Sequence, residues 1–110
     1  MTESPRIAGG KVPLVLVDLH HSLASYYNLD HSPKYWQQPG VWQDVKASYD
    51  KFFQLNPDDY GYHHNFARDA YLCGQYQEFI AQAKLFPSTN YQFFGGEAEF
   101  QKMLERAASK

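Results

Sequence analysis

Histidine is the residue type in this chain that could bind a metal ion or move protons near neutral pH. Five histidines are present, and four of them form the adjacent pairs His20-His21 and His63-His64. Neighbouring side chains of a helix point about 100° apart, so neither pair can chelate a metal as histidines four positions apart do. Asp18 and Asp30 could supply carboxylates, but the spacing matches no metal-binding signature. We therefore assign no metal ligand and no cofactor, and expect one histidine of each pair to be hydrogen-bonded in the core and the other to lie in water.

Other catalytic signatures are absent from the sequence. The chain has no Gly-x-Ser-x-Gly elbow and no glycine-rich loop for a phosphate, and Gly95-Gly96 lacks the preceding strand of a nucleotide fingerprint. The single cysteine, Cys73, is expected to pack as a small apolar residue at the end of a helix. Asp58-Asp59 is expected to cap a helix that begins near Tyr60. No residue is assigned a catalytic role.

Amphipathic helices are the elements that would position these residues. Apolar side chains recur three and four positions apart, which predicts an all-α fold with helices near residues 13–27, 41–55, 61–73, 75–86 and 97–108. Breakers separate the central three helices. The run Asn56-Pro57-Asp58-Asp59 ends the first, and Gly74 suits a left-handed C-cap after the second.

The segment from Val12 to Leu19 allows two interpretations. Its Val-Leu-Val alternation suits a buried strand, but no other segment reads as a strand that could pair with it. A helix is preferred because Pro13 suits a first helical position and an apolar stripe continues through Leu16, Leu19, Leu23 and Tyr26. The run is short and interrupted by Asp18, so it is neither a signal-peptide core nor a membrane span.

At 110 residues the chain fits one domain, predicted over 12–110, while the polar residues 1–11 are expected to be disordered. Aromatic residues make up 17% of the chain, so its core should be built from rings. The predicted core comprises Trp42, Tyr49, Phe66, Ala70, Phe79 and Ile80. Tyr35 and Trp36 lie in a connection rich in turn formers, and they are interpreted as a lid on the helical core rather than a ligand platform.

The layout resembles the tetratricopeptide repeat, in which pairs of antiparallel helices stack on one another. The resemblance rests on Pro57, on Phe66 followed by Ala67, and on the turn Gly74-Gln75-Tyr76-Gln77-Glu78. It covers one unit and the preceding half. Phe79, Ala83 and the early Pro87 depart from the repeat pattern.

The resemblance implies stacked helical hairpins closed by a C-terminal capping helix. It also implies that the first helix of the unit lines a concave surface, with His64, Arg68 and Tyr71 as the binding residues. A histidine and an arginine one turn apart could hold a carboxylate or an acidic peptide. The alternative for Arg68 is a surface charge that pairs with a nearby acid.

A looser resemblance links the chain to an uncharacterised bacterial domain family of helical-repeat type. The residues that carry it are His20, Tyr35-Trp36, Trp42, Pro57, Asn65, Ala67 and Gly74. This resemblance implies no activity.

The leading hypothesis is a cytoplasmic helical-repeat module that binds a protein or a peptide and has no catalytic activity. Self-association is compatible with it. The alternatives are a small metal-binding or hydrolytic domain that uses the histidine pairs, and a packed C-terminal piece of a larger protein. The formal net charge of -2 disfavours nucleic acid as a partner, and no membrane association is expected.

Overall fold

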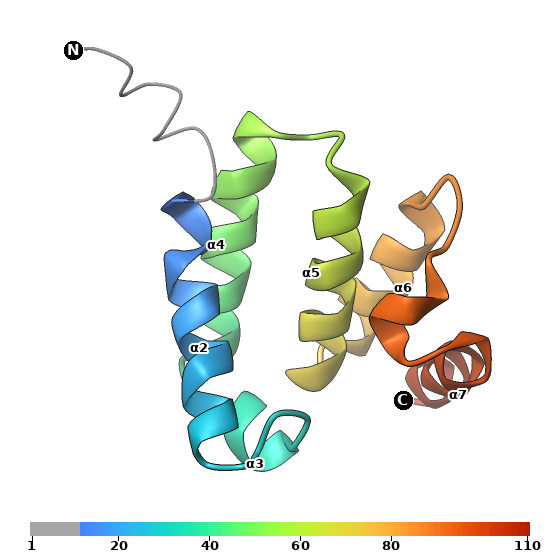
Figure 1. The fold of residues 1–110 in the computed structure, drawn as a ribbon. Coiled ribbons are helices and arrows are strands. Elements are labelled where there is room, and N and C mark those ends of the chain that lie inside the picture. Colours follow the sequence, from blue (N-terminus) through green and yellow to red (C-terminus); the bar gives the residue numbers. More distant parts are fainter. Residues whose placement is uncertain (1–11) are drawn as a thin grey trace. The chain divides into compact units, whose positions relative to one another are not determined.

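The computed structural model describes residues 12–110, and in this part of the chain helices joined by turns and loops are present, with no strand (Figure 1). The elements are η1 (Val12–Leu14), α2 (Val15–Tyr26), α3 (Pro33–Trp36), α4 (Val41–Leu55), α5 (Tyr60–Leu72), α6 (Tyr76–Leu85), η2 (Tyr91–Phe94) and α7 (Glu97–Ala108). The all-α prediction is confirmed, including the choice of helix over strand for the first apolar run. The prediction of disorder for residues 1–11 lies outside the described residues.

Two short helices were missed where the sequence suggested connections. In α3, the Ser32 side chain accepts a hydrogen bond from the Lys34 backbone N–H at 3.1 Å, and Pro33 occupies the first helical position. Asn90 starts η2 in the same way by accepting from the Gln92 N–H at 3.2 Å. Both caps satisfy a backbone donor that a helix start leaves unpaired.

The chain divides into two compact units, Met1–Asp59 and Tyr60–Lys110. We call them the first and the second unit and describe each by itself. The boundary falls after Pro57, within the turn that was predicted to end a helix. The predicted core set divides accordingly, because Trp42 and Tyr49 belong to the first unit and the other four residues belong to the second.

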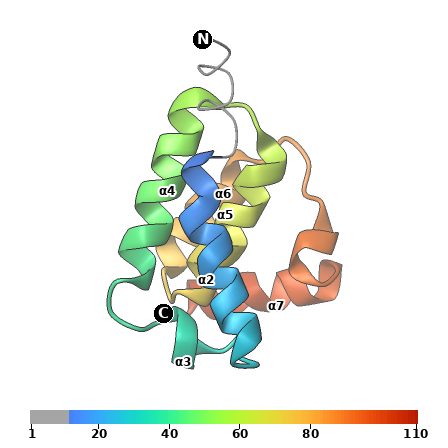
Figure 2. The ribbon, with the colours of Figure 1, turned by 60° about the vertical axis from the view of Figure 1, so that its left-hand side comes forward.

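In the first unit, α2 and α4 pack side by side and η1 also contacts α4 (Figures 1 and 2). Tyr35 and Trp36 of α3 are buried, as the lid interpretation predicted. The Trp36 indole N–H donates to the Asp30 carbonyl at 2.7 Å, and its ring lies 4.6 Å from the His21 ring. The aromatic pair therefore fixes α3 and the loop before it against α2.

The second unit is built on an aromatic core. Its α6 packs against both α5 and α7, and η2 contacts α5 and α7. The buried cluster comprises Ala67, Phe79, Phe94, Phe100 and Ala107, with Ile80 packed at its edge. The Phe94 and Phe100 ring centroids are 4.7 Å apart, and the Phe79 ring lies 5.9 Å from Phe100. Phe66 and Ala70 are buried, as predicted, but they are not members of this cluster.

Two helix ends use the same left-handed C-cap. After α5, Gly74 has a φ of 78° and the Gln75 N–H donates to the Ala70 carbonyl at 2.8 Å. After α2, Asn28 has a φ of 58° and the Leu29 N–H donates to the Ala24 carbonyl at 2.7 Å. A hydrogen bond from a backbone N–H to the carbonyl five residues earlier defines the Schellman motif. The predicted C-cap at Gly74 is therefore confirmed.

Candidate functional site

His64, the first of the three predicted binding residues, is buried and only 3% exposed. Its Nδ1 lies 2.6 Å from the Tyr60 carbonyl oxygen, and its Nε2 accepts a hydrogen bond from the Asn90 N–H at 2.9 Å. The imidazole also stacks on Phe86 with a centroid separation of 3.7 Å. Both ring nitrogens are therefore engaged, with the proton on Nδ1. The prediction that His64 lies on an open surface is wrong.

Arg68 is partly covered, with 29% of its side chain exposed. One terminal guanidinium nitrogen lies 3.4 Å from a carboxylate oxygen of the fully buried Asp69, while Nε is buried without a hydrogen-bond partner. The arginine thus pairs with its neighbouring acid, which was the alternative to ligand binding.

Tyr71, the third predicted residue, packs against the core of the second unit. Its ring lies 5.4 Å from Tyr76 and 5.2 Å from Phe79, and burial raises the pKa of its phenol. The three predicted residues do share one side of α5, as their spacing required. Two of them face inward within the unit: the His64 ring lies against Phe86 and Phe94, and the Tyr71 ring lies against Tyr76 and Phe79 of α6.

His63, which precedes His64 in the sequence, is also buried. His63 is 8% exposed, and its Nδ1 lies 3.0 Å from the side-chain carbonyl oxygen of Gln82 on α6. The Gln82 amide nitrogen in turn donates to a Glu78 carboxylate oxygen at 3.3 Å. The expectation that one histidine of each pair would lie in water is therefore wrong for this pair.

A hydrogen-bonded chain of three side chains crosses the first unit, and no sequence motif indicated it. His20 Nδ1 lies 2.6 Å from the Tyr35 hydroxyl, and His20 Nε2 lies 2.9 Å from a carboxylate oxygen of Asp44. The three residues come from α2, α3 and α4. Because an ionised carboxylate can only accept, His20 Nε2 donates to Asp44, and the tautomer with its proton on Nε2 leaves Nδ1 to accept from the phenol.

The surroundings of this chain favour a structural role. Tyr35 is buried, and burial is the main cause that raises the pKa of its phenol, with the Asp44 carboxylate adding to the rise. The phenol therefore stays protonated at neutral pH and serves as a hydrogen-bond donor. His20 sits 15 residues before Tyr35 and 24 before Asp44, so no local signal in the sequence relates them.

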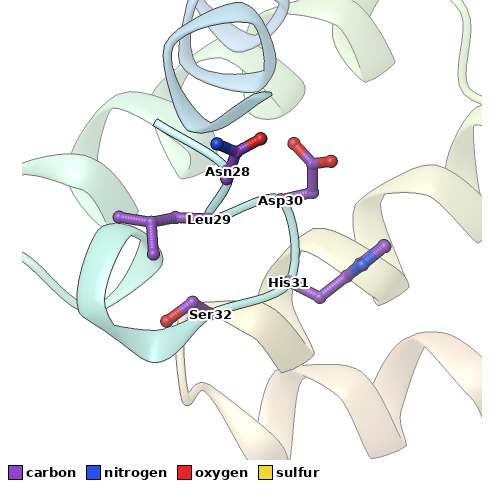
Figure 3. Close-up of a pocket in the computed structure, with 5 residues that line it drawn as sticks. All are labelled: Asn28, Leu29, Asp30, His31 and Ser32. Atoms are coloured by element: carbon purple, nitrogen blue, oxygen red, sulfur yellow. The ribbon is translucent and has the colours of Figure 1, made fainter. Parts of the chain in front are cut away.

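A shallow hollow of about 330 Å³ lies beside the loop between α2 and α3 (Figure 3). Its lining residues are Asn28, Leu29, Asp30, His31 and Ser32. Their side chains do not converge: the Asn28 amide and the Asp30 carboxylate project to one side and His31 to another (Figure 3). Within residues 12–110, no group of three or more His, Cys, Asp or Glu side chains is placed to hold a metal ion.

The most distinctive surface of the first unit is an apolar face of α2, which we call the α2 outer face. It comprises Val15, Leu16, Leu19, Leu23 and Tyr26. Their exposed fractions run from 38% for Leu16 and Leu23 to 78% for Tyr26. These five side chains lie within about 100° of the helix circumference.

The opposite side of α2 faces the interior, since Val17 and Ala24 are buried there. The apolar stripe that suggested a core-facing helix is therefore on the outside. The interior side is held instead by the contacts of His20 with Tyr35 and Asp44 and of His21 with Trp36.

Comparisons of the chain with protein-family models, with curated proteins and with solved structures find no match. Among residues 12–110, no helix has both the length and the apolar character that a membrane span requires. The α2 outer face, with its five exposed apolar side chains, is the candidate site of this chain.

Proposed function

We propose that this chain is a non-catalytic helical module that binds another polypeptide through the α2 outer face. The observation that carries the proposal is the exposure of five large apolar side chains on one side of one helix. Scattered apolar residues are normal on a protein surface, but a contiguous patch of several hundred Å² is typical of an interaction site.

The proposal moves the binding surface from α5 to α2. On α5, His63, His64, Phe66, Ala67, Asp69 and Ala70 are all buried, which leaves little surface for a ligand. The α2 outer face instead offers leucines and a tyrosine that a partner can cover without breaking an existing hydrogen bond. The resemblance to the tetratricopeptide repeat stays part of the proposal, and the α5–α6 hairpin with its Gly74 turn supports it.

The test is site-specific photo-crosslinking of the full chain in a lysate of its source. A photoreactive phenylalanine analogue replaces Leu19, which is 51% exposed at the centre of the face. The control carries the same analogue at Leu85, which is 54% exposed on α6. We expect polypeptide adducts from position 19 that are absent from position 85. Equal labelling of both positions, or none at position 19, would contradict the proposal.

A further inference from the structure

The α2 outer face has the composition of a surface that pairs with itself. No Lys or Arg lies in α2, and Asp18, in its first turn, is its only acidic residue. The acidic peptide suggested for α5 would find no cation here. A surface that binds anionic lipid headgroups needs basic residues along the helix, which α2 lacks.

Charge therefore favours a symmetric partner. In an interface with two-fold symmetry, each patch meets its own copy, so a charged patch would repel itself. The five side chains of the α2 outer face carry no charge, and burying them against their own copies meets no like-charge penalty.

The shape of the face favours an antiparallel pair. Its most exposed residues lie at the two ends of α2, with Val15 at 61% and Tyr26 at 78%. A parallel pair would place the two tyrosines together at one end and the two valines at the other. An antiparallel pair places each tyrosine over the smaller valine, so that bulk and space match at both ends, while Leu19 and Leu23 interdigitate between them.

The area of the face limits the size of the contact. Five side chains with these exposed fractions present on the order of 500 Å². A stable interface buries about 800 Å² on each partner. Polar neighbours such as Ser22 extend the contact, and the pair stays at the small end of specific interfaces.

We infer that two copies of this chain form a weak, antiparallel dimer through the α2 outer face. The inference rests on the proposed function and names the partner. An interface of this size is typical of weak, transient contacts.

The first experiment is sedimentation velocity of the purified full chain between roughly 1 and 300 µM, a range in which weak association is detected. We expect a monomer that converts to a dimer with concentration, and a dissociation constant at least tenfold weaker in Leu19→Glu. The matched control, Leu85→Glu, should dimerise like the natural protein. Circular dichroism confirms that both variants keep their helices.

The second experiment tests the orientation by disulfide trapping in a Cys73→Ala background. The single variants Val15→Cys and Tyr26→Cys are oxidised separately and as a mixture. An antiparallel pair gives cross-linked dimers in the mixture only, whereas a parallel pair gives them in each variant alone. The second outcome would overturn the antiparallel arrangement.

A chain that stays monomeric over the whole concentration range overturns the inference. If the photoreactive analogue at position 19 then captures a different polypeptide, the proposed function stands with another partner. If the analogue at position 19 captures no polypeptide, the dimer and the proposed function are both wrong. Dimerisation that Leu19→Glu leaves unchanged would place the interface elsewhere and also overturn the inference.

Discussion

Cys73 shows how burial sets the chemistry of a single residue. It lies just after α5, is 5% exposed, and burial raises the pKa of its thiol to about 12, with the carboxylate of Asp69 as the second cause. In the unfolded chain the thiol has an ordinary pKa near 9.0. Above that pH the unfolded state loses the proton first and is stabilised by doing so.

We therefore predict that the free energy of unfolding falls as the pH rises from 9 towards 12, and that Cys73→Ala removes this fall between pH 9 and 10. The raised phenol pKa values of Tyr35 and Tyr71 add their own losses only above pH 10. Urea unfolding of both proteins at pH 8, 9, 9.5 and 10 measures the effect. The same slope in the two proteins would show that the thiol is not held protonated.

Tyr35 is predicted to stabilise the first unit through its hydroxyl. Tyr35→Phe leaves His20 Nδ1 without its donor in a partly buried position, which should cost about 1–3 kcal/mol. Tyr27→Phe is the control, because Tyr27 is 59% exposed, and it should change stability by less than about 0.5 kcal/mol. Denaturant unfolding of Tyr35→Phe, His20→Phe and the double variant gives the coupling. If the stability losses of the two single variants sum to the loss of the double variant, Tyr35 and His20 do not interact, which would contradict the hydrogen bond.

At the scale of elements, the left-handed turn between α5 and α6 depends on one glycine. A side chain at the φ of 78° that Gly74 adopts is strained, so Gly74→Ala should cost about 1–2 kcal/mol. Gly61 lies inside α5 without a positive φ and is exposed, so Gly61→Ala should instead stabilise by up to about 1 kcal/mol. Thermal unfolding of both variants tests the opposite signs. If Gly74→Ala and Gly61→Ala change the melting temperature equally, the left-handed conformation at residue 74 does not determine the cost of adding a side chain.

The packing of α6 against η2 and α7 depends on Phe79, whose ring contacts Tyr71, Phe94 and Phe100. Truncating this fully buried side chain to alanine should cost about 3–5 kcal/mol, because it removes the centre of the cluster. Leu85→Ala on the exposed side of the same helix should cost less than about 1 kcal/mol. Urea unfolding measures both. A small loss in Phe79→Ala would place the core of the second unit elsewhere.

At the scale of the whole molecule, dimerisation links stability to concentration. If the dimer forms only from folded chains, mass action raises the melting temperature of the natural protein as its concentration rises. The melting temperature of Leu19→Glu should depend less on concentration, and Leu85→Glu should follow the natural protein. Differential scanning calorimetry at three concentrations tests this. A melting temperature of the natural protein that ignores concentration would argue against a folded dimer.

Local sequence features determined the helices and their ends. The three-and-four apolar spacing and the breakers predicted α4 as residues 41–55 and α7 as 97–108, which are the observed bounds. The C-cap at Gly74 was predictable because it depends on a few consecutive residues. The short α3 and η2 were missed, since their caps depend on one side chain each and their lengths are too small for a periodic signal.

Only the tertiary structure decided which helix faces are covered. The buried side of α2 carries only Val17 and Ala24, beside His20, which bonds to Tyr35 and Asp44, 15 and 24 residues further along the chain, while the leucine stripe lies outward. His64 was likewise buried by contacts from distant segments, including the backbone of Asn90, which lies 26 residues further along the chain. Periodicity reports that a helix has an apolar stripe, but the burial of that stripe depends on which distant residues fold against it.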